Sequence, residues 1–357
     1  MNKAGIITLY GNNNYGNRLQ NFAVQESLKK LGIEVETIIY ITKGGRNIEN
    51  DMKCSQNKLN TFKKFNENIK FYHTKLYMDR DLETDFGNDL DYFVIGSDQI
   101  WNYKFWDVFS PKVFASFANN NQKKISFAAS IGVSDVPEKE SEEYKIFEEN
   151  LKNLDYISVR EEAAKNIIKE ISGIDDTKVI LDPTMLLEKE EWEKVMKKPE
   201  NLETDNFIVK SFLGNTNSDA WEEITKLAKE TDCEIIDISD PNSPYSDIGP
   251  SEFLYLEKNA KMVLTDSFHS CVFAILFSTP FVVFKRDDRF TSMYSRIETL
   301  LNTFNLNYRT FNGKITDKMK ANDYEETNRI LKDKRAEAFE FLEKAFEENV
   351  TSDESIA

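Results

Sequence analysis

A histidine at the junction of a predicted strand and a predicted helix is the residue best placed to do chemistry. The apolar run 262–265 predicts a buried strand and the run 268–277 predicts a helix, so His269 falls in the first helical turn. Free amides at a helix N-terminus attract anions, and an imidazole near Ser267 can donate a hydrogen bond to one. A hydrogen-bonded structural histidine is the alternative. The other histidine of the chain, His73, lies among aromatic and lysine residues and is interpreted as structural.

An arginine follows another predicted strand, at residues 156–159. From the carboxyl end of that strand, Arg160 can reach into a cleft and hold a carboxylate or a phosphate in a bidentate manner. Alternatively, Arg160 pairs with Glu161 or Glu162 on the surface, where an ion pair contributes only about 0 to 1 kcal/mol.

Four cations within twelve residues come after the predicted strand 281–284, which is unusual in an acidic chain. They are Lys285, Arg286, Arg289 and Arg296. This cluster predicts an anion-binding surface beside the cleft. Solvated loop charge is the alternative, and we expect it for at least one of Arg286 and Arg289.

Two polar loops also follow predicted strands. The Asn- and Gly-rich segment 11–17 comes after the strand 5–10, and Ser97, Asp98 and Gln99 come directly after the strand 92–95. Because ligands of parallel sheets collect beyond the carboxyl ends of the strands, both loops predict binding surfaces. An ordinary tight turn is the alternative for the first loop, and a helix N-cap is the alternative for the second.

Strands and helices alternate in two successive series. The strand 5–10, a helix at about 18–31 and a strand at 35–40 form a βαβ unit, which predicts a parallel sheet. The charged, Pro-containing segment 188–205 separates the two series and is interpreted as a domain junction. Further strands are predicted at 124–129, 179–181, 207–212 and 234–238, and further helices at 59–69, 219–228, 251–259 and 322–349.

The predicted fold class is therefore α/β, with two domains facing each other across a cleft. Residues 1–195 are predicted to form an N-terminal α/β domain and residues 196–320 a C-terminal α/β domain. Residues 321–357 are predicted to form a long amphipathic helix with a frayed end. The apolar stripe of this helix comprises Leu331, Ala338, Leu342, Ala345 and Phe346.

Composition excludes several classes of function. The 357 residues carry a formal net charge of −16, and so acidic a surface repels the phosphate backbone of nucleic acids. The two histidines and three separated cysteines (Cys54, Cys233 and Cys271) have no metal-ligand spacing, so neither a metal nor another cofactor is expected. There is no signal peptide and no apolar run of ~18–20 residues, which with the free thiols predicts a cytoplasmic protein.

Six segments, in their order along the chain, resemble the polysaccharide pyruvyl transferase family. The first is the opening strand with Asn14-Tyr15-Gly16-Asn17 and Leu19-Gln20. The other five segments are Gly96-Ser97-Asp98-Gln99-Ile100-Trp101-Asn102, Ser158-Val159-Arg160-Glu161, Leu181-Asp182-Pro183-Thr184, Thr265-Asp266-Ser267-Phe268-His269, and Ser295-Arg296-Ile297 with Leu300-Leu301. Together the six segments extend the likeness over about residues 4–305.

This resemblance implies a glycosyltransferase-B-like fold of two facing Rossmann-like domains. It implies transfer of pyruvate from phosphoenolpyruvate to a sugar of a cell-surface polysaccharide precursor, with formation of a ketal and release of phosphate. The acceptor is implied to be a saccharide or a lipid-linked saccharide, which would bring the protein to the membrane surface.

The resemblance also implies roles for particular residues. His269 would contact the donor and act as general acid, and Asp98 is the candidate base for an acceptor hydroxyl. The N-terminal domain would bind the acceptor, through Asn14, Tyr15, Asn17, Ser97 and Gln99. The C-terminal domain would bind the donor through Arg296, Ser267, Phe268, His269 and Lys285, together with Arg160 of the N-terminal domain.

One departure from the family keeps two alternatives open. Some members carry an arginine two positions before the histidine, where this chain has Ser267, so other cations must balance the charge of the donor. A nucleotide-sugar glycosyltransferase, with Lys285 and Arg160 on a diphosphate, is the first alternative. A sugar-binding relative without catalysis is the second.

Overall fold

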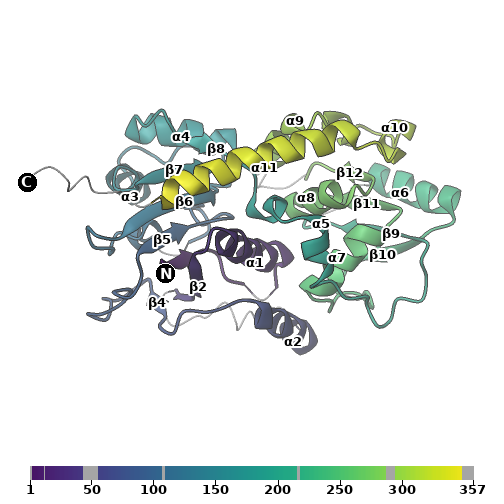
Figure 1. Ribbon diagram of the computed structural model, residues 1–357. Coiled ribbons are helices and arrows are strands. Elements are labelled where there is room, and N and C mark those ends of the chain that lie inside the picture. Colours follow the sequence, from purple (N-terminus) through teal and green to yellow (C-terminus); the bar gives the residue numbers. More distant parts are fainter. Residues whose placement is uncertain are drawn as a thin grey trace, which may run out of the picture.

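Two parallel β-sheets, drawn side by side in Figure 1, form the frame of the protein in this computed structural model. One sheet is built from the first half of the chain and the other from residues after Asn206. The structure describes residues 2–11, 13–42, 55–106, 109–214, 218–286 and 294–347.

The first sheet has six strands in the order β2-β1-β5-β6-β7-β8, and all neighbouring pairs are parallel. Alternate side chains of each strand point to opposite faces. Ile6 and Val94 lie in the core beneath helix α1, whereas Ile7 and Ile95 lie in a separate core with α3 and α4. The strands are β1 (Lys3–Ile7), β2 (Glu34–Ile38), β5 (Tyr92–Ile95), β6 (Lys123–Ala129), β7 (Tyr156–Val159) and β8 (Lys178–Val179).

The second sheet has four parallel strands in the order β10-β9-β11-β12. Helices cover both faces of this sheet as well: Val263 packs toward α7 and α8, and Leu264 packs toward α6 and α10. The strands are β9 (Phe207–Ser211), β10 (Glu234–Asp237), β11 (Met262–Thr265) and β12 (Phe281–Val283). The helices of the molecule are α1 (Tyr15–Lys30), α2 (Gln56–Phe65), α3 (Glu142–Leu151), α4 (Glu162–Ser172), α5 (Lys189–Glu193), α6 (Ser218–Thr231), α7 (Pro250–Asn259), α8 (Phe268–Phe277), α9 (Ser295–Thr303), α10 (Asp317–Lys320) and α11 (Glu325–Phe346).

The segment between the two sheets is packed rather than extended. Trp192, on α5, is fully buried, and its ring lies 5.5 Å from that of Phe22 and 5.0 Å from that of Phe273. Phe22 belongs to the first half of the chain and Phe273 to the second, so one hydrophobic core continues through both halves.

The last helix, α11, runs from the second half of the molecule back across the first (Figure 1). Near its end, Phe346 packs on Tyr92 with a ring separation of 4.8 Å, and Phe341 contacts Tyr156 edge-on at 6.4 Å. Arg335 donates from Nη2 to the Leu187 carbonyl at 2.8 Å. All five residues of the predicted stripe are buried, so the amphipathic interpretation of this helix is confirmed.

Some predicted boundaries are wrong. The first helix begins at Tyr15 rather than about residue 18, because the Asn14 side chain accepts from the Asn17 amide and caps the helix earlier. The helix predicted at 59–69 ends at Phe65 and continues as a 3₁₀ turn. A two-stranded parallel sheet of β3 (Tyr40–Ile41) and β4 (Leu76–Tyr77) was not predicted.

Candidate active site

The carboxyl ends of strands from both sheets bring four charged side chains together. Asp98 follows β5, Arg160 follows β7, Asp182 follows β8, and His269 stands in the first turn of α8 after β11. We call these four residues the charged cluster. They are between 2% and 8% exposed, so a reaction beside them would be largely shielded from water.

Arg160 is the centre of the charged cluster. Its Nη1 donates to Asp182 Oδ2 at 2.5 Å, and its Nη2 donates to Asp98 Oδ1 at 3.0 Å. The guanidinium lies 4.3 Å from the centre of the Phe268 ring. The alternative partner Glu161 is 4.0 Å away, and its Oε1 accepts instead from Ser130 Oγ at 2.8 Å. The arginine is therefore a buried, oriented cation rather than a surface charge.

Burial by itself would raise the pKa of both aspartates of the cluster, but the neighbouring positive charges outweigh it. The pKa of Asp98 is lowered by Arg160, His269 and Arg296, and the pKa of Asp182 is lowered by Arg160 and His269. Both carboxylates remain ionised at neutral pH. A carboxylate with a lowered pKa is a weak base, so the geometry favours Asp98 as a partner for Arg160 over Asp98 as a base.

His269 lies between the two halves of the molecule. Its Nε2 is 3.7 Å from Asp182 Oδ2 and makes no hydrogen bond within the described part of the chain. On its other side, a β-carbon added to Gly16 would lie 2.0 Å from His269 Nδ1. The glycine of the Asn14–Asn17 motif therefore allows the imidazole to rest against the first turn of α1.

Arg296, near the start of α9, is the second buried cation. It is 6% exposed and lies 5.8 Å from the Phe268 ring, and we find no acidic partner or hydrogen bond for it among the described residues. Burial, and then repulsion by Arg160, lower the pKa of Arg296 to about 10, which leaves it protonated at neutral pH. Asp98 and Glu161 act on Arg296 through space, but neither carboxylate pairs with it directly. A buried cation with no directly paired carboxylate is the arrangement expected of an anion-binding site.

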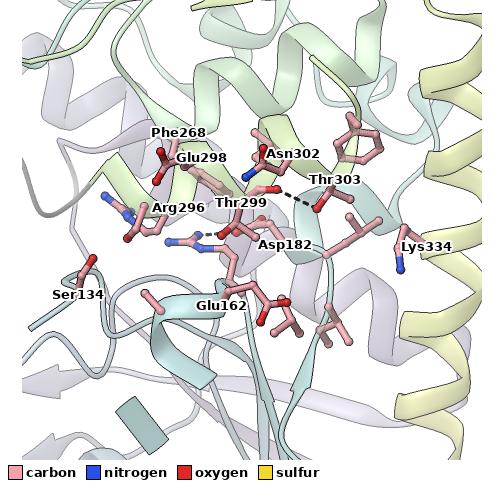
Figure 2. A pocket seen from close by; sticks show the side chains of 18 of the residues that line it. Ser134, Glu162, Asp182, Phe268, Arg296, Glu298, Thr299, Asn302, Thr303 and Lys334 are labelled. Carbon is pink, nitrogen blue, oxygen red and sulfur yellow. Dashed lines mark hydrogen bonds and ion pairs between the residues drawn. The ribbon is translucent and has the colours of Figure 1, made fainter. Parts of the chain in front are cut away.

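A cavity of about 500 Å³ opens onto these cations. Its lining includes four buried residues, Arg160, Asp182, Phe268 and Arg296, and we call the part that they line the inner end of the cavity. Figure 2 labels three of them, Asp182, Phe268 and Arg296. This volume lies within the ~300–1,000 Å³ typical of small-molecule sites.

The remaining predicted donor residues lie less centrally. Ser267 is the N-cap residue of α8 but makes no side-chain cap hydrogen bond. Lys285 is exposed, with its Nζ 5.0 Å from the Tyr294 ring centre. Arg286 pairs with Asp266 at 3.2 Å and is thus a structural cation, and Arg289 lies outside the described residues.

The predicted acceptor residues are mostly committed to internal contacts. Asn17 Nδ2 donates to Asp98, and the Ser97 hydroxyl donates to the Ala128 carbonyl at 3.0 Å. Gln99 is 9% exposed and accepts from Asn102 at 2.9 Å. The Tyr15 ring stacks between Phe62 and Phe253, and Asn14, although exposed, caps α1.

Sequence reasoning did not single out Asp182 or Gly16 as site residues. Asp182 contacts Arg160, Thr184 and Ser97, and it lies next to His269, so it joins more of the site than any predicted residue except Arg160. A carboxylate directly after the predicted strand 179–181 was the available signal. Within the described ranges, no group of three or more His, Cys, Asp or Glu side chains could hold a metal ion, and no helix could cross a membrane.

The arrangement of two parallel-sheet units with a site between them is a glycosyltransferase-B-like fold, as predicted. The UDP-GlcNAc 2-epimerase of Methanocaldococcus jannaschii superposes with a TM-score of 0.53 at 14% identity, over 95% of this chain and 92% of that one. The corresponding epimerase of Rickettsia bellii gives 0.49 at 12% identity over 96% of each chain. At these identities the likeness is one of fold.

The sequence profile for polysaccharide pyruvyl transferase matches residues 14–288. The chain therefore belongs to the polysaccharide pyruvyl transferase family and is a transferase, and the resemblance inferred from the six motifs is confirmed. A comparison with curated protein sequences gives no match.

Proposed function

We propose that this protein transfers the pyruvyl group of phosphoenolpyruvate to two hydroxyls of a saccharide in the precursor of a cell-surface polysaccharide. The observation that carries the proposal is Arg296, a buried cation without an acidic partner among the described residues, at the inner end of a cavity beside Arg160. A donor with a carboxylate and a phosphate would give Arg296 the direct anionic partner that Asp98 and Asp182, both paired with Arg160, do not provide.

The two arginines have different tasks in this proposal. Arg160 already has two carboxylate partners, so its further contribution to a bound anion is limited. Arg296 carries most of the attraction for the donor, and Phe268, which both guanidiniums approach, forms the apolar surface beneath the enol carbons.

His269 delivers a proton to the donor's methylene carbon, which becomes the methyl group of the product. One acceptor hydroxyl then bonds to C2 and the second replaces the phosphate there, so two C–O bonds form and one breaks. Of the two hydroxyl protons, one replenishes His269 and the other leaves with the phosphate. Asp182 Oδ2 lies 3.7 Å from Nε2 of the imidazole, and a general acid contributes typically 10²–10⁴-fold in rate.

Calorimetric titration with phosphoenolpyruvate tests the donor. We expect Arg296→Ala to weaken binding about 10- to 100-fold, because it removes a charge-assisted contact. Arg329→Ala is the matched control, since Arg329 is an exposed arginine on α11, and it should bind like the native protein.

The catalytic role of His269 is tested by phosphate release in the presence of an acceptor. His269→Ala should lose at least about 100-fold in turnover, whereas His73→Ala, at the other histidine, should retain it. A native protein that ignores phosphoenolpyruvate and binds nucleotide-sugars would overturn the proposal in favour of a glycosyltransferase.

A further inference from the structure

The cavity that contains the donor residues extends well beyond them. Its outer end is walled by α9 on one side and by the start of α4 on the other (Figure 2). The inner residues are nearly buried, whereas Glu162, Glu298 and Asn302 at the outer end are exposed. Besides Lys334, the outer end presents acidic, amide and hydroxyl side chains, those of Glu162, Asn166, Glu298, Thr299, Asn302 and Thr303.

The chemistry of the outer end differs from that of the inner end. Carboxylates accept hydrogen bonds, amides both donate and accept, and together they suit a ligand that presents many hydroxyls. Of the residues described there, Lys334 is the one cation, and its Nζ is paired with Glu337 at 2.7 Å. A phosphate or uronate at this end would face Glu162 and Glu298 without a free counter-charge.

Four of the five residues predicted to bind the acceptor are engaged in contacts within the protein. Ser97 is fully buried, Gln99 and Asn17 are less than a tenth exposed, and the Tyr15 ring lies between two other rings. These side chains cannot contact a saccharide without giving up the contacts that hold the site together. The cavity, in contrast, is larger than a three-carbon phosphate requires.

We infer that the outer end of this cavity binds the acceptor as an uncharged sugar residue, between α4 and α9. Its reacting hydroxyls point inward, toward the donor held by Arg160 and Arg296. The inference rests on the proposed function, because the donor must occupy the inner end for the hydroxyls to meet it.

Filling the outer end tests the inference. Ala163 on α4 and Thr299 on α9 line opposite walls and are half-buried, so Ala163→Trp and Thr299→Gln each reduce the space for a sugar. Both variants should bind phosphoenolpyruvate within about twofold of the native protein, which also shows that they fold. Saturation-transfer NMR in the presence of phosphoenolpyruvate then reports contact with methyl β-glycosides of glucose, galactose, mannose and N-acetylglucosamine.

We expect at least one of these neutral glycosides to bind the native protein. Ala163→Trp and Thr299→Gln should each bind that glycoside at least about tenfold more weakly. Glu298→Gln should weaken the same contact, whereas Glu170→Gln, an exposed glutamate farther along α4, should not. The negatively charged methyl galacturonide should not bind. Unchanged glycoside binding in the filled variants, binding of only the galacturonide, or no glycoside contact at all would overturn the acceptor site. Failure of the native protein to bind phosphoenolpyruvate would instead overturn the proposed function.

Discussion

The imidazole of His269 lies where a β-carbon on residue 16 would be, which makes Gly16 a positioning residue. We predict that Gly16→Ala displaces the imidazole and lowers kcat by about 10- to 100-fold, since a misplacement of ~1 Å can cost that much. Donor affinity should change less than kcat, because Arg296 is untouched.

A double-mutant cycle separates this contact from a general effect on α1. In a His269→Ala background, the added methyl group has no imidazole to meet, so Gly16→Ala should leave the unfolding free energy unchanged or slightly raised. An equal loss of stability in both backgrounds would contradict the positioning role.

A second prediction for a single residue concerns Asp182 and the pH dependence of folding stability. Its pKa is lowered in the folded protein, so its stabilising contribution is complete above the unfolded value of ~3.9 and is lost as pH falls toward the folded value. Asp182→Asn should cost about 3–5 kcal/mol of unfolding free energy at pH 7, because it leaves Arg160 with a missing partner.

Urea unfolding between pH 8 and pH 3 measures this difference. The difference in unfolding free energy between the native protein and Asp182→Asn should be constant above about pH 5 and shrink below about pH 4. Asp205→Asn serves as the control, because Asp205 is an exposed residue 3.5 Å from Lys198, and it should cost less than about 1 kcal/mol. A difference that is independent of pH would contradict the assignment.

The sequence was informative about the cations and less informative about their partners. Arg160 was detectable because it directly follows a predicted strand, and Arg296 because four cations within twelve residues are unusual in an acidic chain. Asp182 was not, because an Asp before Pro-Thr has the signature of a helix cap, and its Oδ1 does accept from the Thr184 amide at 3.0 Å. The acceptor residues were inferred from the family resemblance of two polar loops, and a loop motif does not indicate whether a side chain points outward or into its own network.

At the scale of elements, a buried hydrogen bond joins α7 to α8, the helix that carries His269. Ser270 Oγ donates to Glu257 Oε1, and both side chains are fully buried. Burial raises the pKa of Glu257 to about 8, although the bond from Ser270 opposes the shift. The folded protein thus holds Glu257 protonated at a pH where the unfolded chain ionises it.

Folding stability should therefore fall as pH rises from about 4.5 to 8 and level off above that. Glu257→Gln keeps the acceptor for Ser270 and removes this penalty, so it should raise the unfolding free energy at pH 7 by as much as ~3 kcal/mol. Urea unfolding at pH 5, 7 and 8.5 measures the gain, with the exposed Glu203→Gln as control. A gain that is equal at pH 5 and pH 8.5 would contradict a protonated Glu257.

Element types were predictable from continuous apolar runs, as in β11 and α8, or from an apolar stripe with helical spacing, as in α11. Their ends were less predictable, because they depend on single contacts such as the Asn14 cap. The small β3–β4 sheet was missed because strands of two residues, Tyr40–Ile41 and Leu76–Tyr77, carry no period.

At the scale of the whole molecule, the two sheets share one core through Trp192. We predict that Trp192→Ala destabilises both halves together by about 3–5 kcal/mol, as expected for a large cavity at a fully buried site. Amide exchange of β1 and β11 should accelerate to a similar extent.

Trp221→Ala is the control for this measurement, because Trp221 is 45% exposed and lies on α6, away from the shared core. Acceleration confined to one sheet in Trp192→Ala would mean that the halves unfold independently.

The return of α11 onto the first sheet has a consequence for synthesis on the ribosome. β8 ends at Val179, but the helix whose Phe341 and Phe346 cover Tyr156 and Tyr92 ends at residue 346. At ~5–20 residues per second, the apolar surface beneath α11 waits on the order of ten to thirty seconds for its cover. During that interval we expect Tyr92 and Tyr156 to lack the cover that α11 gives them in the folded protein, so the nascent first half exposes apolar surface until residue 346 has been synthesised.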